Sequence, residues 1–222
     1  MRITKSWMVI PFIVLLSACG LSPMEEKKEI ESEEPVNILE ESSLFIEDSN
    51  NSGHYLFETN DSKYLNEKGF TIWTTNKTNS SNKFEPITVD IAKTSGRAES
   101  GFGIIFCEQQ YEGKPYMLAV MINTNGLYTI GKVVNGVFFH LEGNWKFSGY
   151  INKGYGFKNR IRVSYDISKE SFVLEINDEE ITTFTVPEKI SYKDSKSGFV
   201  VVISNREEFP AKAVKVEFEE KN

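Results

Sequence analysis

Cysteine and histidine side chains are the first candidates for nucleophilic or metal chemistry in this 222-residue chain, which has two of each. Cys107 lies in the apolar run GFGIIFCEQQ, where a buried thiol is inert. His54 and His140 lie far apart, and no His-x-x-x-His, Cys-x-x-Cys or Gly-x-Ser-x-Gly motif accompanies them. The sequence therefore predicts no metal site and no catalytic residue among these side chains. The remaining cysteine, Cys19, needs a different explanation.

The N-terminus places Cys19 at the end of an export signal. Arg2 and Lys5 precede an apolar run over residues 7–16, a layout typical of secretory signal peptides. The run is too short for a membrane-spanning helix, which needs about twenty residues. The tetrapeptide LSAC that ends at Cys19 resembles the lipobox of bacterial lipoproteins. This resemblance implies removal of residues 1–18, acylation of Cys19 and lipid anchoring in the bacterial cell envelope, facing the periplasm or the exterior. An ordinary signal peptide with an incidental Cys19 is the alternative.

Carboxylates dominate the next segment, residues 19–43, which contains MEEKKEIESEEPVNILEESS. It has too few large apolar side chains to bury enough surface for folding, so we expect a flexible tether. A short acidic helix over EEKKEIESEE, ended by Pro35, is the alternative. The formal net charge of the chain is -7, and cleavage before Cys19 would make it more negative. This balance argues against nucleic acid or anionic lipid as a main partner, which leaves the lipid anchor as the only predicted membrane contact.

The rest of the chain, residues 44–222, is long enough for one sizeable core. Alternation of apolar and polar residues dominates it, as in AVKVEFE (213–219), and a period of two predicts half-buried strands. Asn-Gly pairs at 125–126 and 135–136 favour tight hairpins, so PYMLAVMINT, LYTIGKVV and VFFHLEG are predicted to form three consecutive antiparallel strands. A second meander is predicted in NRIRVSYDI, SFVLEIN and ITTFTVP. Further strands are expected at FTIWTT, FEPITVDIAK, GFGIIFCEQ and GFVVVIS, which favours an all-β sandwich.

One stretch carries a family resemblance. GFGIIFCEQQYEGKPYMLAVMINTNGLYTIGKVVNGVFFHL is similar to the central strands of bacterial concanavalin A-like (LamG-like, lectin/glucanase) domains, through Gly101, Gly103, Tyr116, Tyr128, Ile130, Lys132, Asn135, Gly136 and Phe138. RIRVSYDISKESFVLEINDEEI resembles a later strand pair of that family, with Asn177-Asp178 in place of the usual Asn-Gly turn. The resemblance implies an antiparallel two-sheet jelly-roll sandwich. It also implies that the first and last strands pair, so that SLFIED would lie beside AVKVEFE and C-terminal truncation would not be tolerated.

The resemblance allows two further chemistries to be tested on the residues. Hydrolases of the laminarinase type carry Glu-x-Asp-x-x-Glu on one strand, and this motif is missing from the chain; the nearest alternating pair, Glu217 and Glu219, is expected on a solvated face. The fragment DSNNSG (48–53) offers oxygens at alternate positions, as a calcium loop does. Thr59 stands where a bidentate Glu would be required, so an Asn/Ser/Gly turn is the preferred interpretation. We therefore predict no catalytic residue, no metal and no cofactor other than the covalent lipid.

Aromatic side chains are the remaining candidates for ligand contact, because their faces stack on the C–H faces of sugar rings. The candidate ligand-binding residues are Trp73, Tyr128, Lys132, Trp145 and Tyr155. Core burial of Trp73 and Trp145 is an alternative, and Lys132 would equally suit a solvated surface. The leading hypothesis is a non-catalytic envelope lipoprotein that binds a glycan or a glycosylated partner. A glycoside hydrolase-like enzyme with diverged catalytic residues and an adhesive or structural lipoprotein that binds protein remain open. The sequence does not predict the oligomeric state.

Overall fold

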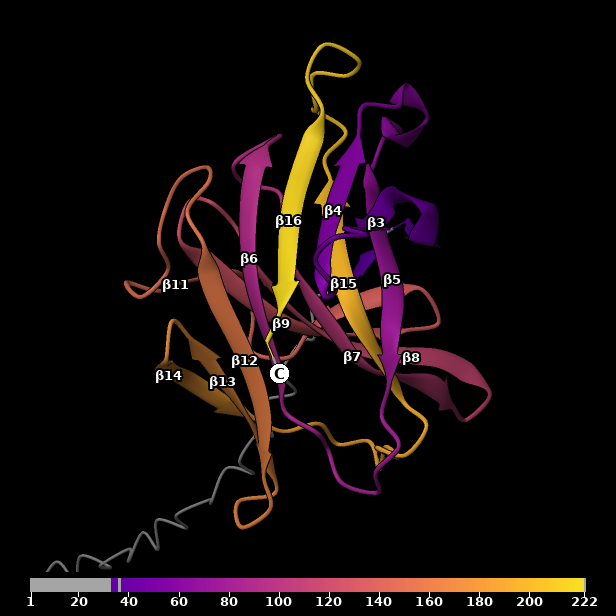
Figure 1. Ribbon diagram of the computed structural model, residues 1–222. Coiled ribbons are helices and arrows are strands. Elements are labelled where there is room, and N and C mark those ends of the chain that lie inside the picture. Colours follow the sequence, from indigo (N-terminus) through magenta and orange to yellow (C-terminus); the bar gives the residue numbers. More distant parts are fainter. Residues whose placement is uncertain (1–32, 36, 222) are drawn as a thin grey trace, which may run out of the picture. The chain divides into compact units, whose positions relative to one another are not determined.

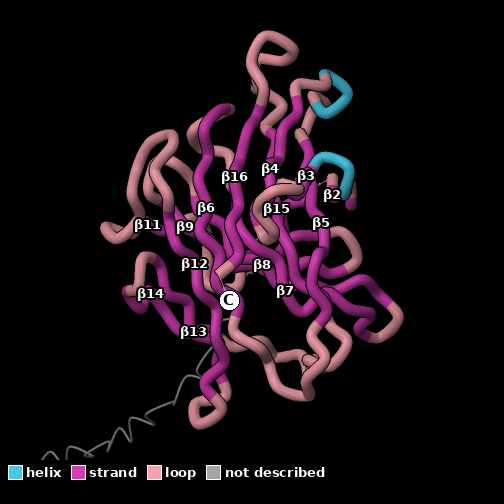
Figure 2. The backbone as a smooth tube through the Cα atoms, in the orientation of Figure 1, coloured by secondary structure: helices cyan, strands magenta, loops and turns pink. Residues whose placement is uncertain are grey.

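The computed structural model describes residues 33–35 and 37–221, and these form an all-β structure with two short 3-10 turns, Ser42–Leu44 and Ser62–Tyr64 (Figures 1 and 2). The predicted signal peptide and Cys19 lie outside these residues. Within the described part of the chain, no helix is long and apolar enough to cross a membrane.

In the described residues, sixteen strands build two sheets. Sheet A has the order β1 (Glu33–Pro35), β10 (Val137–His140), β9 (Leu127–Val134), β8 (Lys114–Ile122), β7 (Phe102–Tyr111), β15 (Lys196–Ile203), β5 (Phe70–Thr78) and β2 (Ile38–Glu40), with β11 (Lys146–Phe147) also paired to β9. Sheet B has the order β14 (Glu179–Phe184), β13 (Ser171–Ile176), β12 (Asn159–Asp166), β6 (Ile87–Ser95), β16 (Val214–Glu220), β4 (His54–Thr59) and β3 (Phe45–Glu47). The predicted antiparallel two-sheet jelly-roll sandwich is confirmed.

The local turn signals account for both meanders. β8, β9 and β10 are neighbours in sheet A, and the β9–β10 turn has positive φ at Asn135 (51°) and Gly136 (79°), as a two-residue hairpin requires. β12, β13 and β14 are neighbours in sheet B, and Asn177 and Asp178 take up the same left-handed conformation at the β13–β14 turn. Asparagine and aspartate tolerate this region best among residues with a side chain, which explains why the missing glycine does no harm there.

The pairing of SLFIED with the last strand, which the resemblance implied, is wrong. β16 lies between β6 and β4, and the predicted neighbour SLFIED forms β3, one strand further out. The prediction missed β4, HYLFET, which follows β3 through a tight turn and therefore occupies the place beside β16.

Sheet A begins earlier than the predicted domain. β1 and β2 lie in the range 33–40, which was predicted as tether, because backbone pairing with β10 and β5 does not depend on apolar content. In a flat sheet, seven strand spacings would separate them by about 34 Å. Only two residues connect them, which allows about 11 Å. Sheet A therefore curls until its two ends lie close together.

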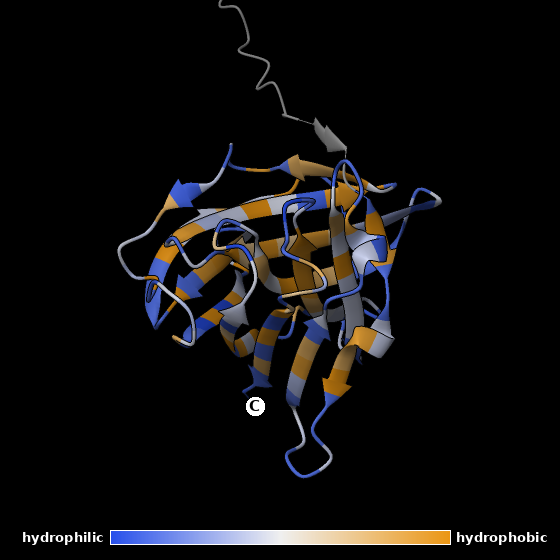
Figure 3. Cartoon of the chain, turned by 90° about the horizontal axis from the view of Figure 1, so that it is seen from above, coloured by the Kyte–Doolittle hydropathy of each residue, from blue (hydrophilic) through white to orange (hydrophobic). Residues whose placement is uncertain are grey.

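Alternating side chains fill the space between the sheets. The main core comprises aromatic and β-branched residues from both inner faces, and Figure 3 shows the alternation of apolar and polar positions along the strands. Phe199 from sheet A and Phe218 from sheet B stack across this core with ring centroids 4.4 Å apart. Cys107 is buried in the same core, as predicted, and burial raises the pKa of its thiol well above the ordinary value. The predicted burial of Cys107 is confirmed.

A second apolar cluster lies on the face of sheet A that points away from sheet B. Met117, Ala119 and Met121 of β8 belong to it, whereas the alternating residues Leu118 and Val120 belong to the main core. The buried members are Trp73, Ile105, Met117, Ala119, Met121, Val133, Phe138 and Val200. Ile38 of β2 packs against this cluster, so the curl of sheet A encloses apolar residues on both of its faces.

Candidate functional site

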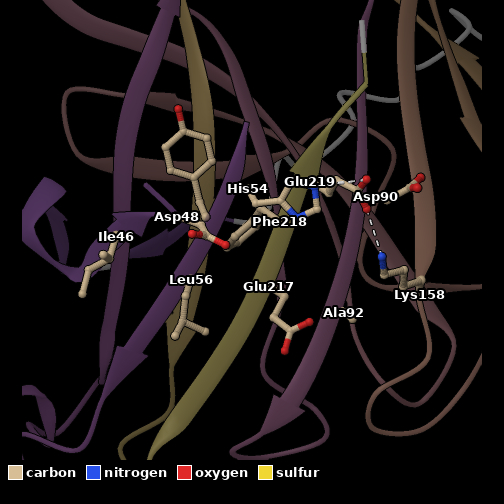
Figure 4. A pocket seen from close by; sticks show the side chains of 11 residues that line it. Ile46, Asp48, His54, Leu56, Asp90, Ala92, Lys158, Glu217, Phe218 and Glu219 are labelled. Carbon is tan, nitrogen blue, oxygen red and sulfur yellow. Dashed lines mark hydrogen bonds and ion pairs between the residues drawn. The ribbon is translucent and has the colours of Figure 1, made fainter. Parts of the chain in front are cut away.

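A hollow of about 360 Å³ lies on the outer face of sheet B, over β3, β4, β16 and β6 (Figure 4). Strand alternation creates it: Val214, Val216 and Phe218 point into the core, which leaves Glu217 and Glu219 on the outside. The volume is at the small end of the range of about 300–1,000 Å³ found for ligand sites. The hollow is therefore large enough for a small ligand and open to solvent.

One side of the hollow is apolar. Ile46 of β3 is 62% exposed and Leu56 of β4 is 36% exposed, and the two are paired across neighbouring strands. Ala92 of β6 lines the hollow on the other side of β16. Large aliphatic side chains that remain exposed on a sheet face cost hydration free energy, and a ligand that covers them recovers part of it.

The other side of the hollow is charged, and Glu219 is its centre. The carboxylate of Glu219 lies 2.9 Å from Lys158 Nζ and 3.2 Å from His54 Nε2, and it also accepts a hydrogen bond from Lys221. The hydrogen bonds from Lys221 and Lys158 lower the pKa of Glu219 to about 2. Glu219 is therefore ionised throughout the neutral pH range.

Asp90 of β6, which pairs with Glu219 of β16 in the sheet register, is also kept ionised by cationic neighbours. Partial burial opposes its ionisation, but hydrogen bonds from Arg160 and Lys221 outweigh this and keep the pKa of Asp90 below its ordinary value. The distances are 2.8 Å to Arg160 Nε and 3.3 Å to Lys221 Nζ. Since glycoside hydrolysis needs one carboxylic acid with a raised pKa as proton donor, the pair of Asp90 and Glu219 is unsuited to that role.

The predicted tryptophans do not face this hollow. Trp73 is 9% exposed and belongs to the second apolar cluster of sheet A. Trp145, half-buried, packs against the same cluster, and its ring lies over Gly101, where a Cβ would come within 2.8 Å of the ring. The structure thus brings Trp73 and Trp145 into one apolar cluster. This agrees with the alternative stated above, in which both side chains are buried and do not contact a ligand.

Tyr128 and Lys132 lie on the opposite face of β9, directed toward sheet B. Tyr128 is part of the main core, and burial raises the pKa of its hydroxyl. Lys132 is buried, pairs with Glu188 at 2.9 Å and has its ammonium 5.7 Å from the Phe139 ring centroid. Neither residue lies with the tryptophans, because β9 alternates its side chains between the two faces.

Tyr155 is the one exposed member of the predicted set. It is 43% exposed in the loop before β12, its hydroxyl donates to the Gly96 carbonyl, and partial burial raises its pKa. The loop ends at Lys158, which lines the hollow, so Tyr155 is the predicted residue nearest in sequence to it.

Residues 48–53 form the turn between β3 and β4. Asp48 Oδ1 accepts from the Asn50 backbone N–H at 2.9 Å, and Glu47 accepts from the Gly53 N–H at 3.1 Å. These oxygens are used within the turn, in agreement with the preferred Asn/Ser/Gly interpretation. No group of three or more His, Cys, Asp or Glu side chains in the described ranges is arranged to hold a metal ion.

The lining residues Ile46, Leu56, Asp90 and Lys158 were not predicted from the sequence. Alternation identifies the outward positions of a single strand, and it did identify Glu217 and Glu219 as an outward pair. The order of strands β3, β4, β16 and β6 decides which outward positions become neighbours, and local patterns do not contain that order.

Comparisons with known proteins address the fold. No protein-family model and no curated protein sequence matches the chain. A Bacillus licheniformis beta-glucanase superposes with a TM-score of 0.53 at 7% identity, over 86% of this chain and 88% of the glucanase. A structure described as a native glycosidic hydrolase superposes with a TM-score of 0.52 at 8% identity, over 84% and 83% of the two chains. The predicted concanavalin A-like jelly roll is therefore confirmed, and identities this low carry the fold alone.

A buried ammonium, that of Lys93, lies close to the loop that holds Tyr155 and donates hydrogen bonds to the turn after β6. Lys93 is 1% exposed, and its Nζ donates to the carbonyls of Arg97 (2.7 Å) and Ser100 (3.2 Å). Burial lowers the pKa of Lys93 to about 8, although the nearby carboxylates of Glu207 and Glu99 oppose this. The folded chain therefore releases this proton at a lower pH than the unfolded chain, in which lysine has a pKa of about 10.4.

This difference predicts that the contribution of Lys93 to stability rises with pH. Below pH 8 both states hold the proton, and from pH 8 to 10 only the unfolded state does, so the free energy of unfolding should increase by about 2 kcal/mol relative to a variant without this ammonium. The comparison with a variant is needed because the raised pKa values of the buried tyrosines act in the opposite direction near pH 10. Urea unfolding at pH 7 to 10 checks this, with Lys93→Met expected to lose the increase. NMR titration of the Lys93 side chain in the unmodified protein is an independent test, and a midpoint above 10 contradicts the prediction.

Proposed function

We propose that the chain is a bacterial envelope lipoprotein whose jelly-roll domain binds a glycan or a glycosylated partner on the outer face of sheet B. The observation that carries this proposal is the hollow, in which the apolar wall of Ile46, Leu56 and Ala92 faces the charged groups around Glu219. A sugar ring has the matching chemistry, because its C–H face is apolar and its hydroxyls donate to and accept from charged groups.

The fold is compatible with this role. The two superposed structures are named as a beta-glucanase and a glycosidic hydrolase, so this architecture can present a saccharide-binding surface. A fold supports many functions, and for that reason the proposal depends on the hollow more than on these names.

Binding without turnover is the proposed mode. Glu219 and Asp90 are held ionised by Lys158, Lys221 and Arg160, so neither can supply a proton to a glycosidic oxygen near neutral pH. The same ion pairs hold the side chains in one arrangement, which lowers the entropy lost when a ligand hydrogen-bonds to them.

The proposed location follows from the export signal. Cleavage before Cys19 and acylation would anchor the domain to the envelope through residues 20–32, since several acyl chains at about 0.8 kcal/mol per buried methylene hold a protein firmly on a membrane. Replacing Cys19 with Ala should abolish lipid labelling and release the protein from membrane fractions. Unchanged labelling and partitioning would contradict the anchor and leave the binding proposal untouched.

A glycan array followed by calorimetry on the hits tests the binding proposal. Leu56→Ser should weaken binding of any hit about tenfold, because covering an aliphatic side chain contributes roughly 1.4 kcal/mol. The midpoint of thermal unfolding should stay the same, since Leu56 points outward. Ile167→Ser is the matched control: Ile167 is 67% exposed at the turn between β12 and β13 of the same sheet, and its replacement should leave binding unchanged.

Two outcomes would replace this proposal. Release of reducing sugar from a bound glycan would favour the hydrolase-like alternative. An array without hits, together with capture of a defined protein partner, would favour the adhesive alternative.

A further inference from the structure

The charged groups that line the hollow are unequal in number. Four carboxylates line it, against one lysine and one histidine: Asp48, Asp90, Glu217, Glu219, Lys158 and His54. Lys158 and His54 lie close to Glu219 alone, and Asp90 is satisfied from outside the hollow by Arg160 and Lys221. Two carboxylates of the lining, Asp48 and Glu217, therefore have no cationic partner among the described residues, which leaves the hollow with an excess of negative charge.

Glu217 is exposed, and its strand β16 lies between the other strands beneath the hollow. In the register of sheet B it pairs with Leu56 on β4 and with Ala92 on β6, so its carboxylate rises between two apolar neighbours (Figure 4). Among the residues that the structure describes, no lysine, arginine or histidine forms an ion pair with Glu217, and its carboxylate accepts no hydrogen bond. Asp48, at the rim, accepts only from the backbone of its own turn.

We propose that the ligand of this hollow is a saccharide that carries free ammonium groups, a de-N-acetylated amino sugar, with an ammonium at Glu217 and the ring face on Leu56 and Ile46. This inference rests on the proposed glycan-binding function and narrows it to one chemical class. A ligand ammonium beside Glu217 neutralises the negative charge of this carboxylate. An N-acetylated sugar has no such positive charge, and a uronate carries a negative charge that Glu217 would repel.

A sugar suits the surface better than a cationic peptide. Three of the four strands beneath the hollow, β4, β16 and β6, are paired on both sides, and the edge strand β3 is only three residues long, so an extended peptide finds little backbone to pair with. The ligand therefore meets mainly side chains, and the apolar residues on both sides of Glu217 match a ring with polar groups at its edge.

Calorimetry with three trisaccharides tests the inference on the full chain: a β-1,4-linked glucosamine trimer, its N-acetylated form and a uronate trimer. At pH 6 and low salt, the glucosamine trimer should bind at least tenfold more tightly than the other two, and 0.5 M NaCl should remove most of this preference by screening. Glu217→Gln should reduce the affinity for the glucosamine trimer about tenfold and thereby remove most of its preference over the N-acetylated trimer. Glu180→Gln is the matched control, because Glu180 is exposed at the far edge of the same sheet.

The possible results separate a failure of the amino-sugar inference from a failure of the glycan-binding proposal. Equal affinity for the glucosamine and N-acetylated trimers, or preference for the uronate, overturns the amino-sugar inference and leaves glycan binding intact. Trilysine that binds as tightly as the glucosamine trimer, with the same sensitivity to Glu217→Gln, overturns it in favour of a general cation site. Failure of every saccharide in the trimer set and on the array overturns both proposals.

Discussion

A chain that ends at Ala213 is expected to lose its fold. The deletion removes β16, the strand between β6 and β4 at the centre of sheet B. Val214, Val216 and Phe218 are almost completely buried, and each contributes about 1.5–3 kcal/mol through burial alone. Both ladders of backbone hydrogen bonds are lost as well. The total is comparable with the entire stability of a domain, about 5–15 kcal/mol.

Circular dichroism and limited proteolysis measure this outcome. We expect no cooperative thermal transition and rapid digestion of the truncated chain. A chain that ends at Glu220 is the control, because it keeps β16 and loses mainly the ion pairs of Lys221 with Asp90 and Glu219. Cooperative unfolding of the chain that ends at Ala213 would show that sheet B does not need its central strand.

Gly103→Ala is expected to destabilise the fold by about 3 kcal/mol, at the upper end of the cost of overpacking. Gly103 lies in β7, and a Cβ at this position would come within 2.0 Å of the Val120 carbonyl oxygen and 2.9 Å of the Met121 Cα. Both contacts involve the backbone of β8, which cannot move aside as a flexible side chain can. The substitution must therefore separate two strands near the middle of sheet A.

Urea unfolding at equilibrium provides the measurement, with a lower midpoint and an unchanged m-value expected. Gly149→Ala is the matched control, because a Cβ there would meet nothing within 4 Å and the backbone does not have a positive φ. A loss below about 1 kcal/mol for Gly103→Ala would contradict the close approach of β7 and β8. If Gly103→Ala is too insoluble for unfolding measurements, its yield of soluble protein is compared with that of Gly149→Ala. A much lower yield for Gly103→Ala is then the expected result.

Most strands could be predicted because their signals are local. LYTIGKVV is β9 from its first residue to its last, since alternation and the two Asn-Gly turns delimit it. HYLFET was missed although Tyr55 and Phe57 alternate with Leu56 and Glu58. β1 and β2 could not be predicted, because their partners β10 and β5 are distant in sequence.

The neighbours of the candidate site residues could not be predicted either, because they too come from parts of the chain that are distant in sequence. Trp73 and Trp145 were chosen as large aromatics that could face a ligand, and the structure packs both against apolar neighbours on the curled face of sheet A. Which face of a strand is covered depends on the sheet as a whole, whereas the sequence carries only the alternation between faces. Glu217 and Glu219 were correctly expected on an outward face, but their different partners were not predictable.

The sequence by itself determined that this chain forms many short antiparallel strands in two meanders around one core, because hydrophobic period and turn residues act within a few positions. It also predicts lipid attachment at Cys19, because this cysteine follows a charged flank, a short apolar run and small residues. Only the tertiary structure decided that β16 brings Leu56, Glu217 and Ala92 into one row and places Lys158, Lys221 and His54 around Glu219. Strand order joins residues far apart in the chain, and it results from burial and pairing of the whole domain.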